Sequence, residues 1–229
     1  MTAIKFCGLS HASDIDAVNS VFPEYVGFVF WPKSRRFVSS EKAEELRELL
    51  DARIQSVGVF VDADIDSVAD LVRKGIISIA QLHGHEDDEY IAELRNALGS
   101  HDIQIWKAFE VENANDVNSA NESTADLVLL DGGKGEGRTF PWELLSEMKR
   151  PYGLAGGLNA ENVVEAMAKA SEFGKPPELI DVSSAIEPRY SKSSGSGRMS
   201  SESPAAEAPH KSRDLMAEFA RKVRVDCAS

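Results

Sequence analysis

The fold is decided by the stretch Tyr152-Gly-Leu-Ala-Gly-Gly-Leu-Asn-Ala-Glu-Asn-Val-Val-Glu-Ala-Met-Ala-Lys-Ala170, which is followed after a polar link by Leu179-Ile-Asp-Val-Ser183. In this stretch a short apolar run, a glycine turn, an amphipathic segment and a second apolar run follow one another. This order is typical of a βαβ unit, in which a helix joins two parallel strands. It predicts a parallel sheet with helices packed against it.

The same unit recurs along the chain. Eight short runs bounded by Gly, Pro or charged residues are typical of strands, and longer amphipathic segments separate them. Eight such repeats favour a closed (β/α)8 TIM barrel, an α/β fold, over an open doubly wound sheet. The predicted strands are Ala3–Phe6, Tyr25–Phe30, Ser56–Val61, Ile77–Leu82, Ile103–Phe109, Leu127–Asp131, Tyr152–Ala155 and Leu179–Ser183. The predicted helices are Glu41–Leu50, Ile65–Val72, Asp87–Leu98, Trp142–Lys149, Ala160–Ala170 and Ser212–Val225.

Length and composition predict a single domain. The chain has 229 residues, of which 42% are apolar, and this is enough for one sizeable core. We therefore expect residues 1–229 to form one barrel domain. The segment from Glu187 to Lys211 is rich in Ser, Gly, Pro and Ala and has few bulky apolar residues. It predicts a flexible insertion at 188–210, between the eighth strand and the last helix.

Charge and cysteine content exclude several classes of protein. The formal net charge of −13 repels a phosphate backbone at long range, which argues against a nucleic-acid partner. No apolar stretch approaches the roughly 20 residues of a membrane span, and the first residues lack a signal-peptide core, so we expect a cytoplasmic protein. Cys7 and Cys227 are the two cysteines, and their spacing predicts neither a disulfide framework nor a metal site.

Two polar side chains that follow apolar runs are candidates for acid and base catalysis. In this fold the active site lies at the carboxyl ends of the strands. Cys7 directly follows the first predicted strand, and its thiol can act as a base only where nearby cations favour the thiolate, so the alternative of an inert buried cysteine stays open. Asp131 ends the sixth strand, where desolvation of its carboxyl group would suit a general acid. Its alternative role is to brace the glycine-rich loop that follows.

Glycine and hydroxyl residues after the last two strands indicate an anion site. Gly156 and Gly157 lead to Asn159, which is expected at a helix N-cap, and Ser183 and Ser184 follow the eighth strand. Free backbone N–H groups, hydroxyl groups and a helix dipole all favour a bound anion. Many barrels bind phosphate at this position, so these five residues are predicted to contact a phosphorylated small molecule.

Arg36 and His83 are further candidates for substrate contacts. Arg36 lies in the loop after the second strand, where its planar guanidinium group could bind a carboxylate with two hydrogen bonds. His83 alternates with Gln81 and is expected to point into the barrel, where a hydrogen-bonded structural role is equally compatible with the sequence.

Together these motifs resemble the phosphoribosylanthranilate isomerase family. The resemblance covers nearly all of residues 4–187 and resumes at about 211–222. It rests on Lys5-Phe-Cys-Gly-Leu-Ser10, Phe30-Trp-Pro-Lys-Ser-Arg-Arg-Phe-Val-Ser39, Gln81-Leu-His-Gly84, Leu130-Asp131, Leu154-Ala-Gly-Gly-Leu-Asn-Ala-Glu-Asn-Val163 and Asp181-Val-Ser-Ser184.

The resemblance implies an isomerase that needs no cofactor or metal. Its reaction converts N-(5-phosphoribosyl)anthranilate into 1-(2-carboxyphenylamino)-1-deoxyribulose 5-phosphate during tryptophan biosynthesis. By resemblance, Asp131 is the general acid, Cys7 is the general base and Arg36 faces the anthranilate carboxylate. Gly157, Ser183 and Ser184 help to hold the phosphate. The resemblance leaves open whether the protein is a monomer or a homodimer.

Departures from the family pattern keep two alternatives open. Glu136 and Pro141 replace a small hydroxyl residue and an acidic residue, and Ala185 stands where Gly is usual. One alternative is a barrel that binds a phosphorylated metabolite without catalysis. The other is an indoleglycerol-phosphate synthase, which would need a strand-end ammonium group such as that of Lys107 and would leave the Cys7 motif unexplained.

Overall fold

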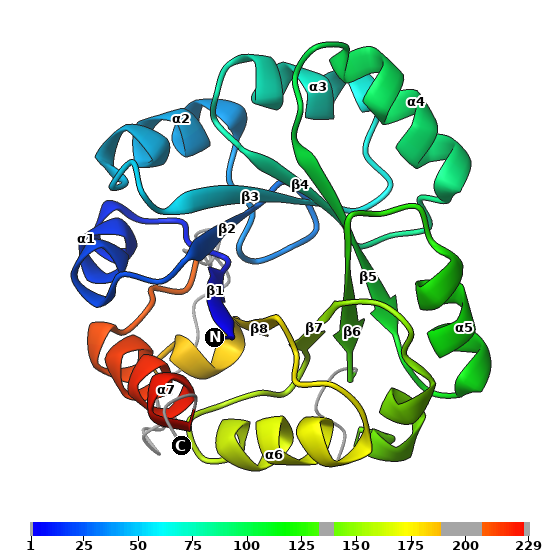
Figure 1. Cartoon of the computed structure of the whole chain (residues 1–229). Helices are drawn as coiled ribbons and strands as arrows, with labels where there is room; N and C mark the ends of the chain where they lie inside the picture. Colours follow the sequence, from blue (N-terminus) through cyan, green and yellow to red (C-terminus); the bar gives the residue numbers. More distant parts are fainter. Residues whose placement is uncertain (1, 133–139, 189–207, 227–229) are drawn as a thin grey trace, which may run out of the picture.

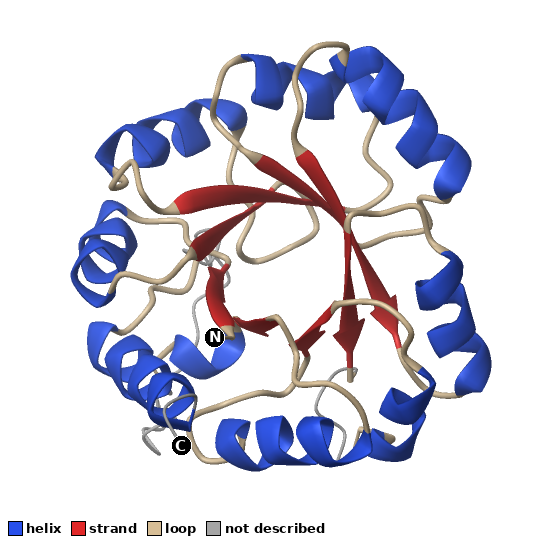
Figure 2. Ribbon diagram, in the orientation of Figure 1, coloured by secondary structure: helices blue, strands red, loops and turns tan. Residues whose placement is uncertain are grey.

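A computed structural model describes residues 2–132, 140–188 and 208–226, which form a closed barrel of eight parallel strands. The helices surround the barrel as an outer ring (Figures 1 and 2). The predicted (β/α)8 fold is therefore confirmed. The strands are β1 Ala3–Cys7, β2 Tyr25–Val29, β3 Gln55–Phe60, β4 Ile79–Leu82, β5 Gln104–Glu110, β6 Leu127–Asp131, β7 Tyr152–Ala155 and β8 Leu179–Val182.

The helical elements of the described residues alternate with these strands. They are α1 Ala12–Val21, α2 Ser40–Leu49, α3 Ile65–Arg73, α4 Asp88–Leu98, α5 Ala114–Glu122, α6 Val163–Phe173 and α7 Arg213–Asp226, with 3-10 helices η1 Trp142–Glu147 and η2 Ser184–Ile186. The sequence did not predict α1 or α5. The reason is their weak apolar pattern, since each helix buries few large apolar side chains: Ile15 and Val18 in α1, and Val117 in α5.

Two predicted helices were wrong in type or in start. The segment predicted as a helix at Trp142–Lys149 is the 3-10 helix η1, because its backbone bonds, Leu144 N to Pro141 O and Met148 N to Leu145 O, span three residues. The helix expected to begin at Ala160 begins at Val163, and Asn162 is its N-cap. Asn159 therefore does not cap α6. Its side chain accepts hydrogen bonds from the backbone of Glu161 and Asn162 in the turn before the helix.

Alternate side chains of the strands fill the barrel interior. An apolar layer made by Val57, Ile79, Trp106, Ala108, Leu129 and Leu179 lies inside the barrel, with Tyr25 packed against it. Tyr25 and Trp106 meet edge to face, with ring centroids 5.0 Å apart. Because side chains of a strand alternate between its two faces, Lys5 and Cys7 of β1 share the interior face with Ala3.

The last helix returns to the first. α7 packs beside α1 and brings the C-terminal part of the chain next to the N-terminal part (Figure 1). The fully buried carboxylate of Asp14 in α1 accepts hydrogen bonds from Ser10 N, His11 N and Lys211 N at 3.0, 3.1 and 2.8 Å. One side chain thus caps its own helix and anchors the chain where it enters α7.

Two predictions concern residues outside the described part. Residues 189–207, which make up most of the predicted insertion at 188–210, and Glu136 lie outside it.

Among the helices that the structure describes, none is both long enough and apolar enough to cross a bilayer.

Asp14 provides a test of this anchor. Because replacing it by Ala leaves three backbone amides without their acceptor, we expect Asp14→Ala to lower the free energy of unfolding by roughly 2 to 4 kcal/mol, measured by urea denaturation. Asp16→Ala changes an exposed carboxylate of the same helix and is the matched control. A loss no larger than that of the control would show that the three amides find other partners.

Candidate active site

Cys7 lies at the carboxyl end of β1, beside a buried ion pair inside the barrel. Lys5 Nζ is 2.8 Å from Asp181 Oδ2, and the Lys5 side chain is fully buried. The register of the barrel makes this contact, because Lys5 is paired with Asp181 across the β1–β8 junction. The thiol, the ammonium group and the carboxylate therefore belong to one cluster.

Burial raises the pKa of the Cys7 thiol above its ordinary value. The positive charges of Lys5 and Lys211 lower the pKa of the thiol, whereas the negative charge of Asp181 raises it further. For Lys5, burial acts to lower the pKa of the ammonium group, but Asp181 and Cys7 outweigh burial and the net direction is upward. Lys5 therefore carries a charge next to a thiol that is neutral at neutral pH.

Gly27 makes room for the thiol. It is paired with Cys7 across β1 and β2, and a Cβ atom at Gly27 would lie 2.8 Å from Cys7 Sγ and 3.3 Å from Lys5 Cε. Real Cβ atoms do not come within 3.0 Å of such neighbours. Any side chain at position 27 would therefore displace the thiol.

Asp131 ends β6 and lies close to His83. His83 Nε2 is 3.5 Å from Asp131 Oδ2, and the exposed fractions of the two side chains are 43% and 20%. Gly156 packs directly on Asp131, since a Cβ atom there would lie 2.2 Å from Oδ1. The carboxyl group is thus bounded by His83 on β4's loop and by the glycine turn after β7.

Arg36 is part of a second charged cluster. Its Nε donates to Glu187 Oε1 at 2.5 Å, Lys211 Nζ donates to the same oxygen at 2.9 Å, and Arg35 bonds to Glu187 Oε2. Burial acts to raise the pKa of Glu187, but Arg36 and Lys211 outweigh it and the net direction is downward. Glu187 is therefore a buried carboxylate with three cationic partners.

The residues predicted to bind phosphate differ in how accessible they are and in whether they already form hydrogen bonds. Gly156 and Gly157 have φ of 82° and 64°, which favours glycine at both positions, and a Cβ atom at Gly157 would meet open space. The Ser183 hydroxyl donates to Cys7 O at 3.0 Å, so its hydrogen is engaged. Ser184 is exposed at the first position of η2. Of these residues, those in the turn after β7 and Ser184 are therefore the most accessible to a phosphate group.

Lys107 does not point into the barrel. Its neighbours Trp106 and Ala108 belong to the interior layer, so Lys107 is on the opposite face of β5. Its Nζ donates to Gly84 O at 2.7 Å and to the buried Glu86 Oε2 at 3.1 Å. The ammonium group that an indoleglycerol-phosphate synthase would need is therefore bonded outside the barrel interior.

Comparison of the sequence with known proteins identifies its family. A family model for N-(5'-phosphoribosyl)anthranilate (PRA) isomerase matches residues 4–195. The chain belongs to this isomerase family. A relative from Acetivibrio thermocellus, N-(5'-phosphoribosyl)anthranilate isomerase, is 40% identical over 198 residues, covering 82% of this chain and 88% of the relative. One from Clostridium acetobutylicum with the same name is 39% identical over 196 residues, covering 82% and 90%.

Solved structures of the family have the same barrel. A phosphoribosylanthranilate isomerase from Thermotoga maritima matches with a TM-score of 0.78 and 28% identity, covering 98% of this chain and 100% of that chain. A family structure in complex with reduced 1-(o-carboxyphenylamino)-1-deoxyribulose 5-phosphate matches with a TM-score of 0.74, 28% identity and the same coverage. The expected family resemblance is therefore confirmed.

The departures from the family pattern that the structure describes lie at the barrel's loops. Pro141 is the N-cap of η1, and Ala185 is in the middle of η2, where it packs against the core. Neither residue carries a charge that would oppose a bound phosphate.

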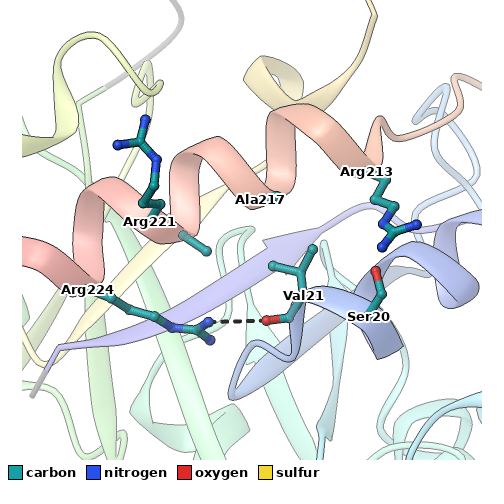
Figure 3. A pocket seen from close by; sticks show the side chains of 7 residues that line it. Ser20, Val21, Arg213, Ala217, Arg221 and Arg224 are labelled. Atoms are coloured by element: carbon teal, nitrogen blue, oxygen red, sulfur yellow. Dashed lines mark hydrogen bonds between the residues drawn. The ribbon is translucent and has the colours of Figure 1, made fainter.

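A surface pocket of about 220 Å³ lies away from the strand ends, between α1 and α7 (Figure 3). Arg213, Arg221 and Arg224 line it from α7, and Ser20 and Val21 line it from α1. Arg224 donates to Val21 O at 3.1 Å and also bonds to Phe22 O, so it satisfies carbonyl groups at the C-terminal end of α1. We interpret this pocket as a seam between two packed helices.

Sequence reasoning missed three charged residues of the site. Asp181 lies inside the eighth strand and is followed by Val182, so it lacks the position at a strand end that identifies Asp131. Glu187 and Lys211 lie at either end of the Ser-rich segment, and no local pattern pairs residues across 24 positions. Their contact depends on the return of the chain from β8 to α7.

The state of Cys7 can be measured directly. In a Cys227→Ser variant labelled with [13Cβ]cysteine, we expect the NMR titration midpoint of Cys7 to lie above 9.0, because burial disfavours the thiolate. The same sample unfolded in urea is the control and should titrate at the ordinary thiol value. A folded midpoint below the unfolded one would mean that the cations outweigh burial.

Proposed function

We propose that Cys7 and Asp131 are the base and the acid of the aldose–ketose isomerisation that characterises the family. The substrate would be N-(5-phosphoribosyl)anthranilate and the product 1-(2-carboxyphenylamino)-1-deoxyribulose 5-phosphate. The observation that supports these roles best is the placement of both groups at the carboxyl ends of strands of one barrel, in a chain of this family. In barrels of this fold, chemistry takes place at that end.

The proposed steps are an internal redox exchange. Asp131 donates a proton to the furanose ring oxygen, the C1–O bond breaks, and the ring opens to a protonated Schiff base. Cys7 then removes the proton from C2, and the electron pair of the C2–H bond forms the double bond of an enolamine. Tautomerisation to the ketone leaves C1 reduced and C2 oxidised, so the reaction requires no external electron carrier. His83, close to Asp131, is a further substrate contact in this proposal.

Proton removal by Cys7 requires the thiolate. Burial opposes that form, while the ammonium groups of Lys5 and Lys211 favour it. A thiol whose pKa lies near or above the working pH is a strong base once ionised, which suits abstraction of a carbon-bound proton. The two lysines would thus allow the buried thiol to ionise.

The charged ends of the substrate have complementary candidates. Arg36 would face the anthranilate carboxylate, and Glu187 holds the Nε edge of its guanidinium group. Gly156, Gly157, Asn159, Ser183 and Ser184 would surround the phosphate. The accessible turn at Gly157 supports this part of the proposal, whereas the engaged hydroxyl of Ser183 leaves its backbone N–H as the donor.

Loss of either catalytic group should abolish most of the activity. We expect Cys7→Ser and Asp131→Asn to lower kcat/KM by about 10² to 10⁴, because each removes a proton-transfer group. Phosphoribosylanthranilate generated in situ would be the substrate, and the disappearance of its fluorescence the measurement. Cys227→Ser and Asp102→Asn, which changes an exposed carboxylate, are the matched controls and should retain wild-type rates.

The same assay separates the alternatives. If folded wild-type protein binds the substrate without converting it, the protein is a non-catalytic binding barrel. If it closes the indole ring of the product, the synthase alternative holds. Wild-type rates in both Cys7→Ser and Asp131→Asn would refute the assignment of base and acid, even if the wild-type protein catalyses the reaction.

We also propose that the segment at 188–210 is a passive insertion in a single barrel domain. The structure places its two flanks together, since Glu187 and Lys211 are paired and Ser212 N donates to Ile186 O at 2.7 Å. Deletion of Pro188–Pro209 should therefore change kcat and KM by less than about threefold. A Michaelis constant that rises tenfold or more would instead assign substrate contacts to this segment.

A cytoplasmic location stays a prediction, as does the choice between a monomer and a homodimer. A structure of monomers generated from a dimeric isomerase of Thermotoga maritima is among the similar structures, with a TM-score of 0.76, 29% identity and coverage of 98% of this chain and 100% of that chain.

A further inference from the structure

Lys211 is a buried cation that the family resemblance does not assign to the site. Its side chain has no exposed surface, and that of Glu187 is 8% exposed. Its Nζ donates to Glu187 Oε1 at 2.9 Å, to Ser183 O at 3.0 Å and more weakly to Ser183 Oγ at 3.5 Å. A buried ammonium group is costly unless it is paired and hydrogen-bonded, and these acceptors meet that requirement.

Two chains of contacts lead from Lys211 to the barrel mouth. Through Glu187, which also accepts from Arg36 Nε at 2.5 Å, it reaches the guanidinium group expected to bind the substrate carboxylate. Through Ser183, whose hydroxyl donates to Cys7 O at 3.0 Å, it reaches the end of β1. Lys211 therefore joins the loop after β2, the end of β8 and the end of β1.

The backbone of Lys211 is fixed independently of its side chain. Its N–H donates to Asp14 Oδ1 at 2.8 Å, and Asp14 is anchored at the start of α1. The ammonium group thus approaches Glu187 from a rigid base. Arg36 also packs closely on Gly8, since a Cβ atom at Gly8 would lie 2.3 Å from Arg36 Cδ.

We propose that Lys211 is a positioning residue for substrate binding, which holds Glu187 and thereby presents the Arg36 guanidinium group in one orientation at the barrel mouth. This inference rests on the proposed function for the identity of the carboxylate that Arg36 binds. Since Glu187 precedes the segment at 188–210 and Lys211 follows it, their pairing closes that segment at its base.

Substitution of Lys211 should change binding more than chemistry. Lys211→Met removes the ammonium group at similar length, and we expect KM for phosphoribosylanthranilate to rise about tenfold, because Arg36 contacts substrate and transition state alike. We expect kcat to fall less, by up to about threefold, since Lys211 favours the Cys7 thiolate less strongly than Lys5 does. Lys211→Arg keeps the charge and should recover most of the affinity. Lys42→Met, which removes an exposed lysine paired with Glu45, is the control and should leave KM unchanged.

A second measurement does not depend on turnover. The 15N Nε–H signal of Arg36, assigned by its loss in Arg36→Lys, reports the hydrogen bond to Glu187 in the protein without substrate. We expect it to shift or broaden in Lys211→Met and to be retained in Lys211→Arg and Lys42→Met. If Lys211→Met does not fold, Lys211→Gln, which keeps a hydrogen-bond donor without the charge, takes its place.

The outcomes separate this inference from the proposed function. An unchanged Arg36 signal in the uncharged variant, or a fall in kcat with KM unchanged, would overturn the positioning role. A wild-type protein that does not convert phosphoribosylanthranilate would refute the isomerase proposal alone, and the Arg36 signal would still decide whether Lys211 orients that side chain.

Discussion

The ion pair between Lys5 and Asp181 is the interaction on which the site depends. It forms inside the barrel at 2.8 Å and spans the junction of β1 and β8, where the barrel closes. Two buried charges of this kind are tolerated only as a pair, since each alone would be strongly unfavourable. The β1–β8 register that closes the barrel therefore brings the two charges together. The same register fixes the position of the Cys7 thiol.

Around Cys7, the structure balances two opposing demands. Burial of the Cys7 thiol disfavours the thiolate, which is the form that the proposed base requires. Cations on two separate elements counter the burial: Lys5 from the same strand, and Lys211 from the segment that enters α7. Lys5 is paired with Asp181, whereas Lys211 shares the Glu187 carboxylate with Arg35 and Arg36.

The sequence predicted the elements with strong periodicity and missed those without it. The eight strands were predicted because each is a short apolar run between breakers, whereas α1 and α5 bury too few large side chains to produce a helical stripe. The position of Cys7, Asp131 and His83 at the carboxyl ends of strands could be predicted because each follows or ends a short apolar run. The Glu187–Lys211 pair could not, because it depends on the three-dimensional path of the chain after β8. The start of α6 was misplaced since Asn159 and Asn162 are both good capping residues and only backbone geometry distinguishes them.

Because β8 closes the barrel, the two partners of the Lys5–Asp181 ion pair are synthesised at different times. Lys5 and Asp181 are 176 residues apart, and at synthesis rates of about 5 to 20 residues per second their appearance is separated by about ten to thirty-five seconds. During this interval β1 can pair with β2, but its other edge has no partner, and an unpaired strand edge is a template for association with other chains. The emerging chain thus contains Cys7 and Lys5 long before Asp181 and Lys211 are synthesised, and the charged cluster around the thiol is completed only when the chain has reached Lys211.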